Sequence, residues 1–322
     1  MEIKMKAPLL ALGLVMAAAG LAKAEYPDRP VTWIVPFSAG GVTDISSRKL
    51  AEVLTEQLGQ PVIVTNKPGA GGLVGTKEAQ GAAPDGYTVL YGSSGPFGII
   101  PALSPEKLTY DPLKDFEVIR GVSASPQMIV THADAPFSTI AELVDYAKAN
   151  PGKLNFGSPG IGTAQHLAGE LFNKATGADM THVPYKAGTS QMVDLASGVL
   201  DLSFEYSPIV KPYVEEGKMK ILGTTGRERI ATYPDAQTVV EAGYPDAVNM
   251  GWTFLGVPAG TPAEIRARLE TAMNAVMADQ RIADMIRTGG QIVVPAVGET
   301  EGKAFIQAEI AKFKAAGGAV SN

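Results

Sequence analysis

Short apolar segments of strand length alternate with amphipathic segments of helix length along most of this chain. Residues 30–37 (PVTWIVPF) have the β-branched and aromatic composition of a strand, and residues 43–59 repeat apolar side chains with the period of a helix. Further strands are expected at 61–66, 87–93, 127–132, 153–158, 180–184, 199–204 and 219–224, and further helices at 71–83, 139–150, 163–175, 189–197, 262–278 and 300–315. Short βα repeats predict an α/β fold with mostly parallel sheets flanked by helices.

The length of the chain, 322 residues, predicts two domains, because single hydrophobic cores stop growing at about 250–300 residues. The βα series is interrupted near residues 120–130 and resumes near 225. We therefore expect one lobe from 25–122 and 226–322 and a second lobe from 123–225, joined by two crossings that form a hinge.

The first 24 residues have the features of a secretory signal peptide. Lys4 and Lys6 precede an apolar run at 7–22, and Ala22-Lys23-Ala24 is a small-x-small cleavage signal. A membrane anchor is the competing interpretation, but the run is short for a bilayer span and ends in small residues. We expect cleavage after Ala24 and export to the periplasm.

Composition excludes several functional classes. The chain has no cysteine, which removes disulfides, thiol catalysis and thiolate metal sites. Its three histidines, at 132, 166 and 182, lack metal-ligand spacing, so we expect neither a metal site nor a cofactor. The net charge is −6; loss of three lysines and one glutamate with residues 1–24 makes it −8. Such a chain binds nucleic acid poorly, and local dipoles must hold any anionic ligand.

The stretch VPFSAGGVTDISSRKLAEVL (35–54) leads from an apolar strand through two glycines into a helix. Backbone N–H groups at a helix start bind anions, but the glycine spacing fits neither a dinucleotide fingerprint nor a P-loop. The alternative is a tight turn with a helix cap. We expect Asp44 to accept amide hydrogen bonds and stabilise the loop. The candidate ligand-binding residues here are Phe37, Ser38, Ala39, Gly40, Gly41, Thr43 and Asp44.

A second stretch, NFGSPGIGTAQHLAGELF (155–172), repeats this strand, glycine turn and helix. If the two turns lie in different lobes, they face each other across a cleft and hold one small anion from both sides. The candidates in this turn are Ser158, Gly160, Ile161, Gly162 and Thr163. A third turn that opens a helix lies within 183–195, and NKPGAGGLVG (66–75) is interpreted as a surface turn and helix start, or less favourably as a partner-docking patch.

Several spaced motifs resemble the periplasmic receptors of the tripartite tricarboxylate transporter family, also called Bug receptors. They are VPFSAGGVTDISSRKLAEVL, VTNKPGAGGLVGT, AAPDGYTVLYGSS, TYDPLKDF, NPGKLNFGSPGIGTAQHLAGELF, THVPYK and VPAGTPAEI. The resemblance covers nearly the whole chain after residue 24. It implies a two-lobed, venus-flytrap, type II periplasmic binding protein. It also implies that the protein captures a carboxylate through backbone amides, hydroxyls and water, and delivers it to a membrane permease. We expect the mature protein to be a monomer.

Ligand identity is left open by departures from the family pattern. Glu205 stands where family members often carry aspartate, and we add Ser94 and Tyr206 to the expected site. The candidate ligands are di- and tricarboxylates, acidic amino acids and aromatic acids. Two other functions compete with transport. An exported serine hydrolase is disfavoured because G-x-S-x-G is absent, so we expect no enzyme, whereas a sensor subunit that partners a signalling protein stays open.

Overall fold

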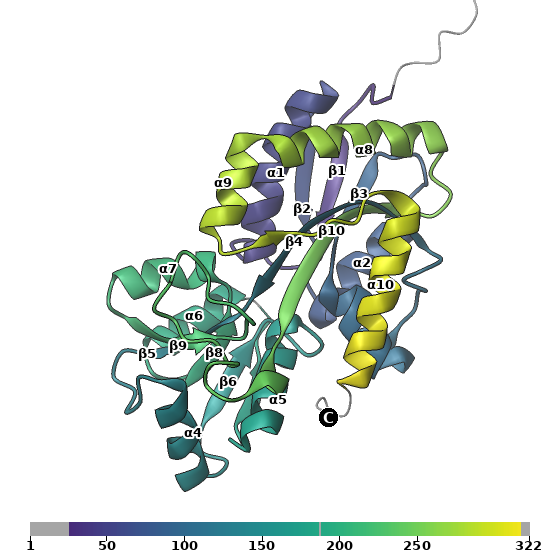
Figure 1. The fold of residues 1–322 in the computed structure, drawn as a ribbon. Helices are drawn as coiled ribbons and strands as arrows, with labels where there is room; N and C mark the ends of the chain where they lie inside the picture. Colours follow the sequence, from purple (N-terminus) through teal and green to yellow (C-terminus); the bar gives the residue numbers. More distant parts are fainter. Residues whose placement is uncertain (1–25, 187, 317–322) are drawn as a thin grey trace, which may run out of the picture.

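The computed structural model describes residues 26–186 and 188–316, which form two lobes, each built around one β-sheet (Figure 1). The predicted signal peptide, residues 1–24, lies outside the described residues. Within the described ranges, no helix is both long enough and apolar enough to cross a membrane.

The upper lobe in Figure 1 contains a six-stranded sheet in the order β11–β4–β10–β3–β1–β2. Its strands are β1 (Val31–Val35), β2 (Val62–Asn66), β3 (Thr88–Ser93), β4 (Phe116–Pro126), β10 (Met250–Pro258) and β11 (Ile292–Val293). Its helices are α1 (Val42–Leu58), α2 (Leu73–Gln80), α3 (Ile100–Leu103), α8 (Ala263–Ala278), α9 (Gln280–Thr288) and α10 (Gly298–Ala315). Short helical turns lie at Ala70–Gly72, Gly95–Ile99 and Pro105–Lys107.

The lower lobe contains a five-stranded sheet in the order β7–β6–β8–β5–β9 (Figure 1). Its strands are β5 (Met128–His132), β6 (Asn155–Ser158), β7 (Thr181–Pro184), β8 (Leu202–Glu205) and β9 (Met219–Thr224). Its helices are α4 (Ile140–Ala149), α5 (Ala164–Thr176), α6 (Gly188–Ala196) and α7 (Ser207–Glu215), with a short turn at Pro245–Ala247.

The sheets are mixed rather than mostly parallel. β1 pairs in parallel with β2 and β3, and β6 pairs in parallel with β7 and β8, as short βα units predict. β10 is antiparallel to β3 and β4, and β5 is antiparallel to β8 and β9. The difference arises because β4 leads into the first crossing between the lobes, and β5 and β10 each follow a crossing instead of a βα unit.

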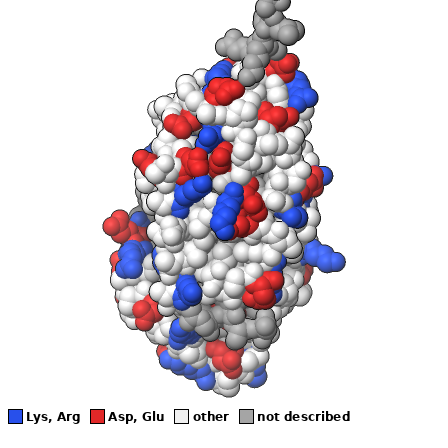
Figure 2. Space-filling view, turned by 90° about the vertical axis from the view of Figure 1, so that its right-hand side faces the viewer, with Lys and Arg blue, Asp and Glu red and all other residues white. Residues whose placement is uncertain are grey.

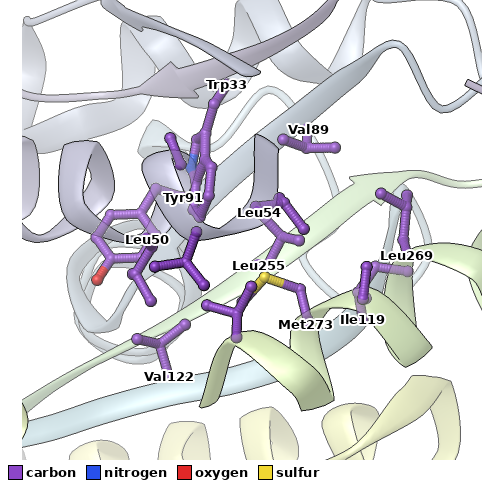
Figure 3. Packing of buried hydrophobic residues seen from close by; sticks show 14 of the residues in the cluster. Trp33, Leu50, Leu54, Val89, Tyr91, Ile119, Val122, Leu255, Leu269 and Met273 are labelled. Atoms are coloured by element: carbon purple, nitrogen blue, oxygen red, sulfur yellow. The ribbon is translucent and has the colours of Figure 1, made fainter. Parts of the chain in front are cut away.

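Both faces of the first sheet are covered, which explains why four of the five residues of β1 are apolar and buried. Val31, Trp33 and Val35 point toward α1 and α8, whereas Ile34 packs on the opposite face. Leu50 and Leu54, one helical turn apart on α1, lie in the same cluster as Trp33 (Figure 3). Burying a leucine contributes about 2–3 kcal/mol, so this packing holds the start of α1 in a defined place.

The crossings between the lobes meet at a buried polar cluster. The Gln127 N–H donates to Thr225 Oγ1 at 2.9 Å, and the Thr225 N–H donates to the Gln127 carbonyl at 2.9 Å. Asn249 Nδ2 donates to Gln127 Oε1 at 3.0 Å. The segment 226–249 packs on the lower lobe, since Val239 and Ala247 belong to its core.

Candidate functional site

A cavity of about 900 Å³ lies between the two lobes. Its walls include the loops after β1, β3, β6, β7 and β8, and the carboxyl ends of strands are where open α/β sheets present ligands. Twelve of the fifteen predicted site residues line it: Phe37, Ser38, Gly40, Gly41, Thr43, Ser94, Gly160, Ile161, Gly162, Thr163, Glu205 and Tyr206. The other three, Ala39, Asp44 and Ser158, do not line the cavity.

Asp44 stabilises the first glycine turn, as expected. Its Oδ2 accepts the Gly40 N–H at 2.9 Å, and its Oδ1 accepts from Asn66 Nδ2 at 3.0 Å and from Arg48 at 2.9 Å. Burial alone would raise the pKa of Asp44, but the hydrogen bonds from Arg48, Gly40 and Asn66 outweigh burial and hold that pKa below its usual value. The ionised carboxylate is therefore part of the loop, and the Gly40 amide is already paired.

The free hydrogen-bond donors next to the first glycine turn are backbone N–H groups at the start of α1. Gly41 is the N-cap of α1 and supplies no side-chain cap. Within the described part of the chain, the N–H groups of Val42 and Thr43 have no hydrogen-bond acceptor, and both residues line the cavity. An uncapped helix start carries partial positive charge, so α1 points an anion-binding end into the cavity.

The second glycine turn is also stabilised from within. The Gly160 N–H donates to Ser158 Oγ at 3.1 Å, and the Gly162 N–H donates to His166 Nδ1 at 3.2 Å. Ser158 Oγ in turn lies 2.7 Å from His182 Nε2. Burial lowers the pKa of His166 to about 4 and that of His182 to about 3, so both rings are neutral near pH 7. The amides of the two glycines are therefore used by the loop.

Thr163 is the N-cap of α5 rather than a free donor. Its Oγ1 accepts the His166 N–H at 3.3 Å and donates to the Gly160 carbonyl at 2.8 Å. The family resemblance implied that hydroxyl groups take part in capture, but the single hydrogen of the Thr163 hydroxyl is already used within the turn. The free donors at this turn are the N–H groups of Ile161, Ala164 and Gln165, which line the cavity and have no acceptor in the described residues.

The two lobes touch on either side of the cavity. Ser38 Oγ of the upper lobe donates to the Lys186 carbonyl of the lower lobe at 3.2 Å. On another side, the backbone of Gly71 packs on Ile161, so closely that a Cβ on Gly71 would lie 2.3 Å from the Ile161 carbonyl oxygen. Pro68–Gly72 therefore forms a wall of the cavity, where we had expected a surface turn.

Glu205 ends β8 and is 3% exposed. Its Oε1 accepts the Tyr206 N–H at 2.8 Å and Gln165 Nε2 at 3.3 Å, and its Oε2 accepts Gln191 Nε2 at 3.3 Å. Burial raises the pKa of Glu205 to about 7, although these donors oppose the rise. Tyr206, beside it, also lines the cavity.

The cavity has few basic side chains. Among the described lining residues only Lys107 and Lys186 are basic, and both are exposed. On the face shown in Figure 2, acidic and basic side chains are interspersed. No group of three or more His, Cys, Asp or Glu is placed to hold a metal ion within the described ranges. Backbone dipoles are therefore the main feature of this cavity that favours an anion.

Several residues that line the cavity were not predicted from the sequence: Val42, Pro68, Gly69, Gly71, Gly72, Tyr91, Ser123, Ser125, Gln165, Thr253 and Gln291. Val42 and Gln165 follow the glycine turns directly, and helix-start numbering alone could have identified them. The others, such as Ser123 and Thr253 on β4 and β10, carry no local signal. Ser123, Ser125 and Thr253 reach the cavity because β4 and β10 lead to the crossings between the lobes.

Two α/β lobes, joined by crossing strands and enclosing a cavity lined by helix N-termini, define a two-lobed solute-binding protein. The chain belongs to the tripartite tricarboxylate transporter family of receptors, whose family model matches residues 46–318. This family consists of receptors and is not an enzyme class.

Solved structures of similar proteins agree with this assignment. The periplasmic binding protein BugD is 33% identical, with a TM-score of 0.85, over 90% of this chain and 97% of BugD. An R. palustris protein solved with adipate is 31% identical, with a TM-score of 0.85, over 90% of this chain and 97% of its own. MatC from Rhodopseudomonas palustris, solved with bound malate, is 30% identical, with a TM-score of 0.85, over 90% of this chain and 99% of MatC.

Proposed function

We propose that this chain is an extracytoplasmic receptor that captures a small organic carboxylate between its lobes and delivers it to a membrane permease. The observation that carries this proposal is a pair of helix starts, α1 from one lobe and α5 from the other. Both reach the same cavity with unpaired backbone N–H groups, at Val42, Thr43, Ala164 and Gln165. Two such ends stabilise one anion from opposite sides without an arginine.

Capture by lobe closure is supported by the contacts between the loops. Ser38 with Lys186, and Gly71 with Ile161, bring the lobes together around the cavity. We place the hinge where the crossings meet, and accordingly propose that the second lobe extends from about residue 127 to about residue 249. This replaces the bounds of 123 and 225 expected from the sequence, because residues 226–249 pack on the lower sheet.

Export, partner and assembly are part of the same proposal. Residues 1–24 act as a signal peptide cleaved after Ala24, which places the mature receptor in the periplasm, as BugD is. The receptor works as a monomer, binds a tripartite tricarboxylate-type permease when loaded, and catalyses no reaction. The ligands of two relatives, adipate and malate, are small dicarboxylates and support this ligand class.

A thermal-shift screen of the mature protein tests the ligand class. A ligand at about 100 times its Kd stabilises the folded state by about 2.7 kcal/mol, which raises Tm by several degrees. The panel contains di- and tricarboxylates, acidic amino acids and aromatic acids, each matched to its neutral amide. We expect at least one acid to raise Tm and its amide to leave Tm unchanged. If no acid does so, or if the amides act equally, the proposal is wrong.

A further inference from the structure

We infer that the ligand carries an ammonium group next to a carboxylate, and that Glu205 is the acceptor for this ammonium. The inference rests on the proposed function and assigns the ligand to the amino acids. It concerns the wall of the cavity formed by the end of β8 and the start of α5.

Glu205 is a buried carboxyl group without a cationic partner. Each of its three donors is neutral: the Tyr206 N–H and the side-chain amides of Gln165 and Gln191. Among the described residues no lysine, arginine or histidine forms an ion pair with it. Two donors reach Oε1 but only one reaches Oε2, so Oε2 keeps a free lone pair in a residue that lines the cavity.

Hydrogen-bond donors are in short supply around this carboxyl. Gln191 is fully buried and donates to both Ser203 Oγ and Glu205 Oε2, yet its own Oε1 has no partner. Buried acceptors without donors are unfavourable. A ligand that brings N–H groups to this wall corrects the shortage, whereas a ligand that brings only oxygen acceptors increases it.

Gln165 links the start of α5 to Glu205. Gln165 is the second residue of α5; its backbone N–H is unpaired, and its side-chain Nε2 lies 3.3 Å from Glu205 Oε1. A carboxylate held at the start of α5 therefore lies within one side chain of Glu205. The ammonium of an amino acid sits on the carbon next to its carboxylate, so a carboxylate bound at this helix start brings the ammonium to the wall that contains Glu205.

Charge leads to the same assignment. Two carboxylates brought together in a buried site repel each other, unless one is protonated or a cation lies between them. Burial raises the pKa of Glu205 to about 7, which shows how poorly the protein itself supports the ionised form. A ligand ammonium supplies the missing positive charge and keeps Glu205 ionised.

Calorimetry with matched ligands at pH 8 tests the inference. Three series differ only in the group next to one carboxylate: aspartate, malate and succinate; glutamate, 2-hydroxyglutarate and glutarate; 2-aminoadipate, 2-hydroxyadipate and adipate. In the series of the right length, we expect the amino compound to bind at least tenfold more tightly than the unsubstituted acid. The Glu205→Gln variant should reduce this preference to less than threefold, while Glu205→Asp should retain part of it.

Glu170→Gln is the matched control, because Glu170 is a partly buried carboxyl group on α5 that does not line the cavity. We expect it to leave the ligand preference unchanged, and circular dichroism confirms that each variant folds. If acids bind but the amino compounds gain nothing, or if Glu205→Gln keeps the preference, the inference is wrong and the carboxylate receptor stands. If no acid of any series binds but another carboxylate of the thermal-shift panel does, the inference is wrong and the proposed function stands. If no carboxylate of either panel binds, both are wrong.

Discussion

At the residue scale, the polar side chains of the glycine turns act on the loops rather than on the cavity. Asp44 accepts from Gly40, and Thr163 both caps α5 and donates to Gly160. These bonds hold each turn in the conformation that exposes the following helix start. Substitutions at these two residues are therefore expected to change stability first.

Thr163→Val should lower the free energy of unfolding by about 1–2 kcal/mol, because it removes the N-cap of α5. Affinity should fall by less than about threefold, since the Thr163 hydroxyl has no hydrogen left for a ligand. Denaturation and calorimetry measure the two effects, with Thr163→Ser as the control that keeps the cap. A loss of affinity by tenfold or more in a folded Thr163→Val variant would show that the hydroxyl contacts the ligand.

Asp44→Asn should lower the free energy of unfolding by about 2 kcal/mol at pH 7, because hydrogen bonds to a charged group are lost. The folded state lowers the pKa of Asp44, so the stability that it contributes is complete above the ordinary pKa of about 4. The difference in free energy of unfolding between the parent and Asp44→Asn should therefore become smaller as the pH falls below about 4.

Urea denaturation from pH 7 down to pH 3 measures this difference, and Asp145→Asn, an exposed position on α4, is the control. A difference between parent and Asp44→Asn that stays constant over the whole range would contradict the assigned role of the carboxylate.

At the element scale, the starts of α1 and α5 carry the proposed site. Val42 and Ala164 are the first helical residues after Gly41 and Thr163. Proline is accepted at this position because its missing N–H has no partner within the helix. A proline there removes one ligand donor and leaves the helix intact.

Ala164→Pro should weaken carboxylate binding about ten- to a hundredfold, which corresponds to one charge-assisted hydrogen bond of about 1.5–3 kcal/mol. Thr163 already has the extended conformation that precedes proline, with φ −77° and ψ 162°. Ala263→Pro is the matched control, since Ala263 begins α8, is exposed and lies outside the cavity. Calorimetry measures the ligand affinity of both variants. If Ala164→Pro binds the carboxylate as tightly as Ala263→Pro, the start of α5 is not part of the site.

At the scale of the whole molecule, the lobes close through backbone contacts that only glycine permits. Gly71 has a φ of 63° and meets the Ile161 carbonyl of the other lobe. Gly59 has a similar φ of 72°, but a Cβ there meets nothing within 4 Å. Alanine at either glycine carries the cost of a left-handed backbone conformation, but only alanine at Gly71 also meets the other lobe. Comparing the two substitutions therefore isolates the effect on closure.

Gly71→Ala should hold the lobes apart and lower ligand affinity at least tenfold. Small-angle scattering should show that a saturating acid compacts the parent but not this variant. Gly59→Ala should lose about 1 kcal/mol of stability and compact as the parent does. If Gly71→Ala compacts like the parent, the Gly71–Ile161 contact plays no part in closure.

The βα units and the positions of the two turns can be read from local sequence alone. The apolar strand of β1, the helical period of α1 and the glycines between them are local features, and local features decide such elements. The receptor family also follows from spaced motifs, and the family match confirms it. Local patterns do not show where a loop lies in the folded molecule. The helix expected at 71–83 was predicted, but the position of the preceding loop, Pro68–Gly72, in the cavity wall was not.

Three features depend on how the chain packs in three dimensions: the mixed sheets, the paired amides of Gly40 and Gly162, and the surroundings of Glu205. β4 and α7 were not predicted, because β4 carries glycine and serines and α7 carries two prolines. Glu205 contacts a residue 40 positions away, and Gln127 contacts one 122 positions away. Hydrogen bonds of this range depend on how the lobes pack, and no local pattern in the chain records them.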